Sequence, residues 1–175
     1  MKQCRTFTLS HHLFKGNTET CAGYIAGNID GADAEYIDDA KDEDFTGADA
    51  LIVGAPTWHT GSDEQRSGTP WDDWLYDTLP SLDLKGKKVA IFGCGDQESY
   101  NDYYCDAAGE LYDKFVEAGC EVYGFTSTDD YNHSESKAER DGKFIGLMFD
   151  EDNQDDMSED RAKNWVSQLK EESFM

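Results

Sequence analysis

The sequence has few basic residues. It contains 15 Lys plus Arg against 38 Asp plus Glu, which gives a formal net charge of −23. Nucleic-acid binding takes most of its affinity from cations laid along phosphates, so a nucleic-acid partner is not expected. The same deficit argues against anionic membrane surfaces. The expected partners are proteins with basic patches, which a negative field attracts at long range. The high content of acidic residues can also be explained by solubility or by adaptation of a whole proteome to salt, and these explanations do not exclude one another.

Long apolar runs and paired cysteines are also missing. No apolar run approaches the roughly 18 residues of a membrane-spanning helix, and the N-terminus lacks the apolar core of a signal peptide. The five cysteines are widely spaced without a Cys-x-x-Cys pair, which argues against a disulfide framework or a zinc site. We therefore expect one soluble domain over residues 1–175, in a reducing compartment, with no membrane insertion and no metal ion.

Short apolar runs alternate with helical patterns along the chain. This alternation predicts an α/β fold, in which helices cover both faces of a parallel sheet. The clearest strands are Ala50–Gly54 and Lys88–Phe92, which are apolar nearly throughout, as strands buried on both faces should be. Weaker strands are predicted at Ala34–Ile37 and Glu121–Phe125.

Three segments carry apolar residues at helical spacing. One begins near Thr18, and a second runs from Cys105 to Gly119. The third lies near the C-terminus, where Ser158 is predicted to cap the helix. The apolar stripe of this third helix consists of Ala162, Trp165, Val166 and Leu169.

Two polar stretches interrupt the pattern. Residues 126–141 are predicted to form a loop inserted into, or just after, the last strand, and an apolar run resumes at Phe144. Residues 150–160 hold seven acidic residues in eleven and no base, which predicts a solvated surface turn.

The loops after the strands are the expected place for a ligand, because open parallel sheets bind ligands beyond the carboxyl ends of their strands. Trp58 follows one buried strand and Tyr100 follows the next, with Gly95 between strand and ring. Two rings on neighbouring loops can sandwich a flat heterocycle, and a glycine allows close backbone approach. The alternative is that Trp58 merely closes the core.

A third loop, Gly16–Thr18, stands at the start of a helix. Unpaired amides and the positive end of a helix dipole suit a phosphate there. As a motif, Gly-Asn-Thr is weak by itself, and it gains weight from its position at the first turn from strand to helix.

In combination, these segments resemble a long-chain flavodoxin. The similarity covers Gly16 to Leu169, and its motifs are APTWHTG, GCGDQESY running into CDA, DGKFIGL and DEDNQ. The resemblance implies a flavodoxin-like, doubly wound five-stranded parallel sheet of order 2-1-3-4-5, with FMN at the switch point; flavodoxin is itself a standard example of this rule. It also identifies the polar stretch 126–141 with the insertion that defines the long-chain class.

The resemblance assigns roles by position. Trp58 and Tyr100 flank the isoalloxazine ring, and the backbone of residues 59–61 contacts its N5 edge. Residues 94–96 address the pyrimidine edge, and residues 16–18 bind the phosphate. The candidate cofactor-binding residues are Lys15, Gly16, Asn17, Thr18, Thr57, Trp58, His59, Thr60, Gly61, Cys94, Gly95, Asp96, Tyr100 and Tyr103.

The first 15 residues depart from the family pattern. The family begins with an apolar strand and a loop of hydroxyl residues, whereas the strand position here is Cys4–Ser10 and two large apolar residues precede Lys15. Arg5 in a central strand would be costly to bury. Family members carry a ribityl-side Asn where this chain has Tyr103. We expect weaker phosphate binding than the family pattern implies, with some attraction restored by Lys15.

The function implied by the resemblance is a low-potential one-electron carrier with non-covalent FMN and no catalytic residue. Such a carrier substitutes for ferredoxin between photosystem I and ferredoxin–NADP reductase. It would be a monomer in the chloroplast stroma of an alga or in a bacterial cytoplasm. One alternative is an FMN-dependent NAD(P)H:quinone reductase, although two covering rings leave no face for nicotinamide. The other is a flavodoxin-like module without FMN that only binds proteins.

Overall fold

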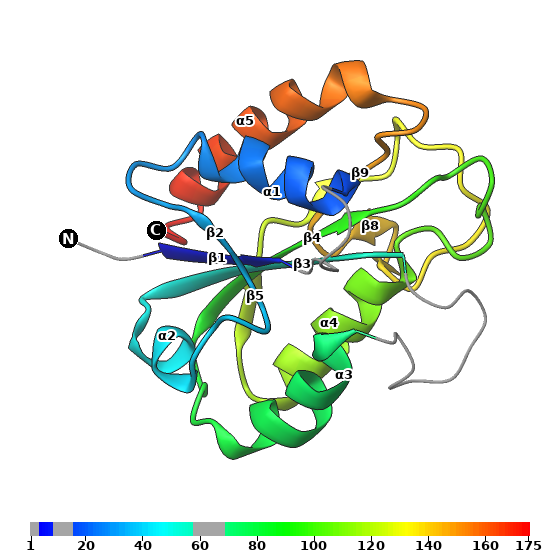
Figure 1. The fold of residues 1–175 in the computed structure, drawn as a ribbon. Helices are drawn as coiled ribbons and strands as arrows, with labels where there is room; N and C mark the ends of the chain where they lie inside the picture. The colour runs from blue at the N-terminus through cyan, green and yellow to red at the C-terminus, as the bar shows by residue number, and fades with distance from the viewer. Residues whose placement is uncertain (1–3, 9–15, 58–68) are drawn as a thin grey trace.

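A parallel sheet forms the middle layer of the molecule (Figure 1). The computed structural model describes residues 4–8, 16–57 and 69–175. The strand order is β2-β1-β3-β4-β5, and β9 also pairs with β4. All of these pairs are parallel. The strands are β1 (Cys4–Thr8), β2 (Ala34–Tyr36), β3 (Ala50–Pro56), β4 (Lys88–Cys94), β5 (Glu121–Tyr123) and β9 (Leu147–Phe149).

The two central strands β3 and β4 are buried along nearly their whole length, because helices cover both faces of the sheet. Their register pairs Ile52 with Ala90 and Gly54 with Phe92. A Cβ at Gly54 would lie 2.2 Å from the Phe92 ring, so glycine is what allows this ring to cross the neighbouring strand. The buried apolar runs read from the sequence thus form the centre of the sheet.

Helices α1 (Asn17–Ala26) and α5 (Asp155–Glu171) cover one face, and α2, α3 and α4 lie on the other (Figure 1). The first face packs Ile25, Phe92 and Trp165 together, and the Trp165 Nε1 donates to the Gly124 carbonyl oxygen at 2.7 Å. The elements of the second face are α2 (Asp42–Gly47), α3 (Pro70–Asp73), a π-helical turn (Trp74–Thr78), a 3-10 turn (Leu79–Ser81) and α4 (Asp106–Glu117).

The last position of the sheet is shared by two short strands. β5 pairs with the first half of β4 and β9 with its second half. Between them the chain leaves the sheet and forms a small antiparallel sheet of order β6-β8-β7. The strands of this second sheet are β6 (Thr126–Ser127), β7 (Glu139–Arg140) and β8 (Lys143–Phe144). We call residues 124–146 the insertion.

The positions in the sheet follow the order β2-β1-β3-β4-β5, but the sheet has six strands where five were expected, because β5 and β9 share the last position and the insertion lies between them. The expected strand Glu121–Phe125 ends earlier, since Gly124 has a φ of +80° that takes the chain out of the sheet. The stretch predicted as an inserted loop contains short strands of its own, since β6, β7 and β8 pair within residues 126–144.

Two predictions near the C-terminus were also wrong. Ser158 does not cap α5, because it lies inside the first turn, where its Oγ donates to a Glu151 carboxylate oxygen; Gln154 holds the cap position. The acidic stretch 150–160 is not a solvated turn throughout. Asp150 is completely buried and hydrogen-bonded, and the helix begins at Asp155.

In the described part of the chain, no helix combines the length and the apolar character needed to cross a membrane. Over the same residues, no group of three or more His, Cys, Asp or Glu side chains is arranged to hold a metal ion.

Candidate functional site

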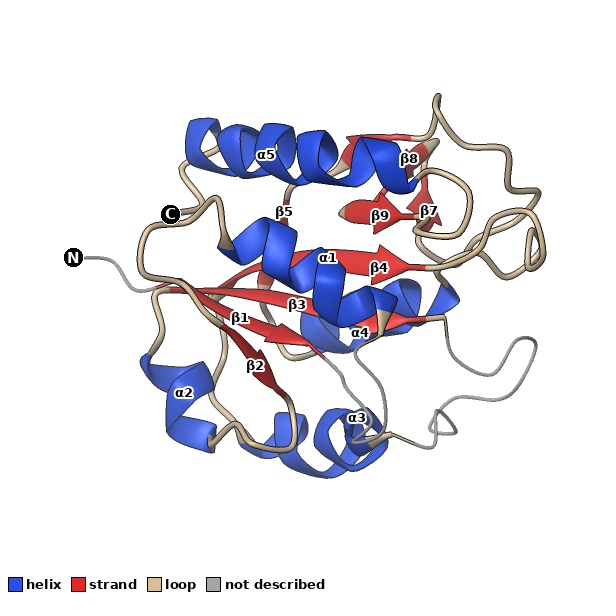
Figure 2. Cartoon of the chain, turned by 45° about the horizontal axis from the view of Figure 1, so that its top comes forward, coloured by secondary structure: helices blue, strands red, loops and turns tan. Residues whose placement is uncertain are grey.

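The candidate site lies at the edge of the sheet where the parallel strands β1, β3 and β4 end and α1 begins (Figure 2). Of the predicted residues, five lie outside the described residues: Lys15, Trp58, His59, Thr60 and Gly61. The other nine are described, and each follows a strand or begins a helix at this edge. They are Gly16, Asn17, Thr18, Thr57, Cys94, Gly95, Asp96, Tyr100 and Tyr103.

The first turn of α1 presents backbone amides without a side-chain cap. Gly16 is the N-cap residue and has an extended backbone conformation. Because glycine has no side chain, no N-cap side chain accepts a hydrogen bond from the first amides of the helix. Gly16 and Asn17 are exposed, whereas Thr18 is buried. Exposed amides at the positive end of a helix suit an anion such as phosphate. Glu19 in the same turn places a negative charge close by and opposes such binding.

The ends of β3 and β4 are tied together by Thr57. Its amide donates to the Cys94 carbonyl oxygen at 2.9 Å, and its Oγ1 approaches the same oxygen at 3.3 Å. The amide of Gly95 donates to the Phe149 carbonyl oxygen at 3.0 Å. A Cβ at Gly95 would lie 2.6 Å from the Thr57 Oγ1 and 3.1 Å from the Tyr104 ring, so no larger residue fits without a shift. Gly95 is itself buried, and Thr57 and Tyr104 fill the space where its Cβ would stand, so this glycine lets the ends of β3 and β4 pack closely against the loop.

Asp96 organises the turn that follows. Its carboxylate accepts hydrogen bonds from the amides of Glu98 and Ser99 at 3.0 and 2.8 Å, and from the Asn153 Nδ2 at 3.0 Å. Hydrogen bonds from the Ser99 side chain and backbone lower the pKa of Asp96 to about 2. Asp96 is therefore a carboxylate at neutral pH, and its visible task is to fix the turn that leads to Tyr100.

Neighbouring tyrosines in this loop face different surroundings. Tyr100 is 50% exposed and Tyr103 is 39% exposed, although both are large aromatic residues. Tyr104 is completely buried, and its hydroxyl donates to the Phe149 carbonyl oxygen at 3.1 Å. The loop is therefore anchored through Tyr104, while Tyr100 and Tyr103 present ring surface to a partner or ligand.

The cysteines near the site are buried thiols. Cys94 is 5% exposed, and Cys21 and Cys105 are fully buried. Burial raises the pKa of the Cys105 thiol, and a hydrogen bond with Cys94 together with burial raises that of Cys21. The thiols of Cys21 and Cys105 therefore stay protonated at neutral pH and do not act as nucleophiles. A contribution of Cys94 to the site would come from its backbone.

A buried polar pair behind the loop was not found from the sequence. Gln97 is 3% exposed. Its backbone amide donates to the Asp150 Oδ2 at 3.2 Å, and its side-chain Oε1 accepts from the backbone amide of Asn132 at 2.6 Å. Asp150 also accepts from the Asn153 amide at 3.1 Å. The DEDNQ motif, which contains Asp150, was the sequence signal that could have indicated this buried pair. Its acidic composition led instead to the prediction of a solvated turn.

The described residues fit a flavin nucleotide. An exposed aromatic ring and a helix start with exposed amides match the isoalloxazine ring and the phosphate of FMN in chemical kind. Within the described part of the site, Cys21, Cys94 and Cys105 are buried, and Asp96 is held by hydrogen bonds from Glu98, Ser99 and Asn153.

Comparisons with known proteins give one family. The model of the family described as flavodoxin matches residues 15–165. A flavodoxin of a Picosynechococcus species is 44% identical over 160 residues, which cover 89% of this chain and 90% of the relative. Flavodoxin 1 of Escherichia coli is 39% identical over 160 residues, covering 90% and 88%. A mutant Fusobacterium nucleatum flavodoxin bound to flavin mononucleotide has a TM-score of 0.85 and 30% identity, covering 98% of this chain and 97% of that one.

Proposed function

The chain belongs to the flavodoxin family, and from that premise we propose how its residues hold FMN and pass on single electrons. It is an FMN-dependent electron carrier and not an enzyme. The structural observation that carries the assignment of residues is the half-exposed ring of Tyr100 on the loop that follows β4. Such a ring offers a flat ligand a stacking surface.

The ring end of the cofactor lies on the loop after β4. Tyr100 stacks on the isoalloxazine, and the backbone from Cys94 to Asp96 meets the pyrimidine edge. Thr57 holds that backbone in place through its two contacts with Cys94. The resemblance adds Trp58 on the other face and residues 59–61 at the N5 edge, which lie outside the described residues.

The phosphate end lies at the start of α1. The exposed amides of Gly16 and Asn17 bind the phosphate, and the positive end of the helix dipole favours its charge. The Thr18 hydroxyl belongs to the same turn, and Lys15 adds a point charge. Tyr103 borders the ribityl chain, where the family pattern has Asn.

FMN supplies the redox chemistry, since it takes up and releases single electrons. The protein excludes water from the ring with Tyr100 and sets the electrostatic field around it. The formal charge of −23 opposes added negative charge on the cofactor and so favours a low reduction potential. Each ~1.4 kcal/mol of such destabilisation lowers a one-electron potential by about 59 mV.

The physiological partners in this proposal are redox proteins with basic patches, such as photosystem I and ferredoxin–NADP reductase. The protein substitutes for ferredoxin between them, in a chloroplast stroma or a bacterial cytoplasm. What supports this is the acidic charge together with the similarity to cyanobacterial flavodoxins. The loop after β4, which carries Tyr100, also has two exposed acidic residues that would face such a partner, Glu98 and Asp102.

The proposal is tested with reconstituted protein. Bound FMN should show flavin absorbance with strongly quenched emission, and the protein should exchange single electrons with a ferredoxin–NADP reductase. The rate should fall as salt rises, because exposed charges are screened beyond about 8–10 Å at physiological ionic strength.

Two outcomes would contradict the proposal. Rapid oxidation of NADPH by the holoprotein alone would favour the quinone reductase alternative. Failure of the purified protein to bind FMN at micromolar concentrations would favour the module that only binds proteins. A rate that does not depend on ionic strength would remove the steering by basic partners but would leave the cofactor assignment intact.

A further inference from the structure

A cavity of about 540 Å³ lies between the end of helix α4 and the irregular helical segment that follows α3. Its floor is apolar: Leu75 and Leu79 are buried, and Leu82 is half-buried. Proteins hold small molecules in cavities of roughly 300–1,000 Å³ that combine apolar walls with a few placed polar groups. The size and the apolar floor of this cavity are those of a small-molecule site.

One wall of the cavity departs from regular helix. Trp74–Thr78 is a π-helical turn, closed by the Leu79 amide, which donates to the Trp74 carbonyl oxygen. A 3-10 turn follows, and it contains Pro80, which has no amide to donate and disfavours a regular α-helix through this point. Single π-helical turns are frequent at functional sites. Here the turn carries two residues that line the cavity, Leu75 and Tyr76.

Beside the apolar floor, α4 contributes a donor and an acceptor that lie side by side. The Lys114 Nζ lies 3.2 Å from a Glu117 carboxylate oxygen. It also lies over the Tyr76 ring, 4.5 Å from the centroid, and the Tyr76 hydroxyl donates to the Glu110 Oε1 at 2.7 Å. The Lys114 side chain is 21% exposed and that of Glu117 is 73% exposed. The ammonium group is therefore fixed by a ring and a carboxylate, and that carboxylate can still accept a further hydrogen bond.

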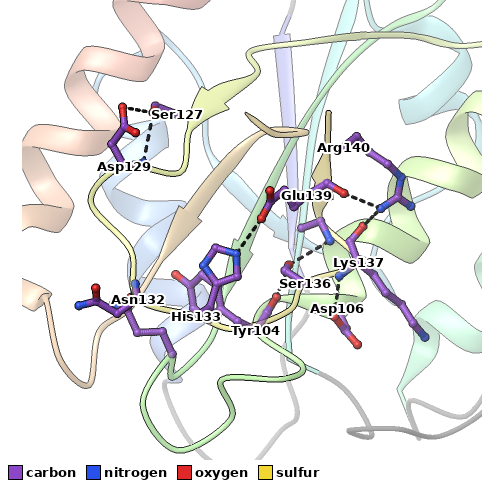
Figure 3. Close-up of polar contacts among 12 residues, drawn as sticks. Tyr104, Asp106, Ser127, Asp129, Asn132, His133, Ser136, Lys137, Glu139 and Arg140 are labelled. Carbon is purple, nitrogen blue, oxygen red and sulfur yellow. Dashed lines mark hydrogen bonds and ion pairs between the residues drawn. The ribbon is translucent and has the colours of Figure 1, made fainter. Parts of the chain in front are cut away.

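The cavity and the flavin site lie at opposite ends of α4. The helix begins at Asp106, whose Oδ1 accepts from the Lys137 amide of the insertion at 2.8 Å (Figure 3). The cavity is lined by the last turn of the helix and its C-cap residue, Ala118. Next to it, the Gly119 carbonyl oxygen accepts from the Gly86 amide at 2.8 Å, just before β4 begins. The flavin site lies where β3 and β4 end, so both sites can be occupied at once.

We propose that this cavity is a second ligand site, which binds a small phenol: a neutral molecule with an apolar body and a hydroxyl head group. The hydroxyl lies against Lys114 and Glu117, and the apolar body contacts Leu75 and Leu79. An ammonium beside a carboxylate matches a hydroxyl, because the hydroxyl accepts from the first and donates to the second.

Charge selects against other head groups. A carboxylate on the ligand would face Glu117, and an amine would face Lys114, so either charge meets a like charge. The formal charge of −23 on the whole chain favours a cation over an anion at long range. An amine is therefore the stricter competitor for the phenol.

The experiment uses the protein loaded with FMN, so that the flavin site is filled. The probes are para-propylphenol, para-propylbenzylamine and para-propylbenzoate, which share one apolar body and differ in head group. Each is titrated at about pH 7, where a phenol is neutral, into nitrogen-labelled protein whose backbone amide shifts are followed. The phenol should shift residues 74–82 and 114–119 with a dissociation constant of about 1 mM or below. The two charged probes should bind at least about threefold more weakly.

Two pairs of variants locate the binding. Ala118→Trp fills the cavity from its edge and should weaken phenol binding at least about tenfold. Val116→Trp is its control, since it adds the same ring to the same helix at a residue that is 45% exposed. Lys114→Met removes the donor, so the phenol should bind about fivefold more weakly, and the amine should now bind more tightly than the phenol. Lys143→Met, at an exposed residue of the insertion, is the control for the loss of one positive charge.

Three results would overturn the inference. The first is the absence of saturable shifts at these residues with para-propylphenol. The second is a charged probe that binds the unmodified protein as tightly as the phenol. The third is phenol binding that survives Ala118→Trp in a protein with a folded amide spectrum, because the ligand would then lie elsewhere. If Ala118→Trp does not fold, Lys114→Met decides, and an unchanged preference for the phenol over the amine overturns the inference.

Discussion

At the ring end of the flavin site, buried polar groups hold the chain in place before any ligand binds. Gln97 and Asp150 are almost fully buried and hydrogen-bonded. At the phosphate end, the first turn of α1 is exposed at Gly16 and Asn17, and no side chain caps it. In the proposed site, flavin affinity at the ring end would therefore depend on the fold, whereas the phosphate end would use backbone amides that are present at the start of any helix.

This contrast predicts two kinds of variant. Changes at the ring end should alter the affinity for FMN and riboflavin alike, and changes to its buried polar groups should also lower stability. Changes at the phosphate end should alter FMN affinity alone, because riboflavin has no phosphate.

Asp150→Ala should have the largest effect, and it should act on the fold. The buried carboxylate accepts from the amides of Gln97 and Asn153, and removing it leaves these donors unpaired. The buried Gln97 amide left unpaired costs about 1–3 kcal/mol, and the partly buried bonds from the Asp152 and Asn153 amides are lost as well. The free energy of unfolding should therefore fall by roughly 3 kcal/mol. Urea unfolding of the apoprotein measures this. Asp152→Ala is the control, because that residue is exposed, and an equal loss in both variants would contradict the role of Asp150.

Tyr100→Ala should weaken binding without changing the fold. Its ring is 50% exposed, so little packing is lost. By analogy with aromatic–base stacking, affinity should fall by about 1–3 kcal/mol for FMN and riboflavin equally, and the emission of the bound flavin should rise. Tyr103→Ala should cost less, because its expected neighbour is the ribityl chain. If Tyr103→Ala costs more than Tyr100→Ala, the two rings have been assigned in the wrong order.

Glu19→Gln should strengthen FMN binding. The carboxylate lies in the first turn of α1, where it repels a phosphate, so its removal should increase FMN affinity by about 0.3–1 kcal/mol at low salt. Riboflavin affinity should not change, and the gain should shrink as salt is added. Glu117→Gln on α4 serves as the control for a general change in net charge. A gain for riboflavin would show that the effect is not at the phosphate.

The smallest effect concerns acid. The pKa of Asp96 falls to about 2 from a usual value of 3.8, so its hydrogen bonds stabilise the folded loop above the usual value, and this stabilisation is lost as pH falls toward about 2. In Asp96→Asn, flavin release should depend less on pH in that window. Release of FMN, followed by its fluorescence from about pH 5 downward, measures the difference. Identical acid curves for the two proteins would show that the Asp96 carboxylate does not hold the loop.

The strand order could be predicted because β3 and β4 are apolar along their length and because the motifs resembled a family of known topology. The nine described candidate residues all lie at the expected edge of the sheet. For β1, an Arg in the strand sequence argued against burial, yet Cys4–Thr8 pairs in parallel with both β2 and β3. Pairing with two neighbours decided the position of this strand more than its own composition did.

The support behind the site could not be predicted. Gln97 and Asp150 are polar residues in polar stretches, where composition indicates exposure. They are buried because partners distant in the sequence satisfy them: Asn132 is 35 positions from Gln97, and Asp150 is 53 positions from it. The prediction that Ser158 caps α5 was wrong because its hydroxyl donates to Glu151, which lies before the helix. Long-range hydrogen bonds leave no periodic signal in a sequence.

The two ends of the insertion lie next to each other. The Thr126 Oγ1 donates to the Gly146 carbonyl oxygen at 2.6 Å, and β6 pairs with β8 immediately inside that point. For protein engineering, this contact between the two ends of the insertion marks a place where the segment between them can be exchanged. Both β5 and β9 would keep their pairing with β4. Lengthening such a loop is inexpensive, since each doubling costs only about 0.6 kcal/mol. A peptide grafted at this position would lie beside the loop that carries Tyr100, because Ser134 and Glu135 of the insertion donate to the Asn101 carbonyl oxygen of that loop.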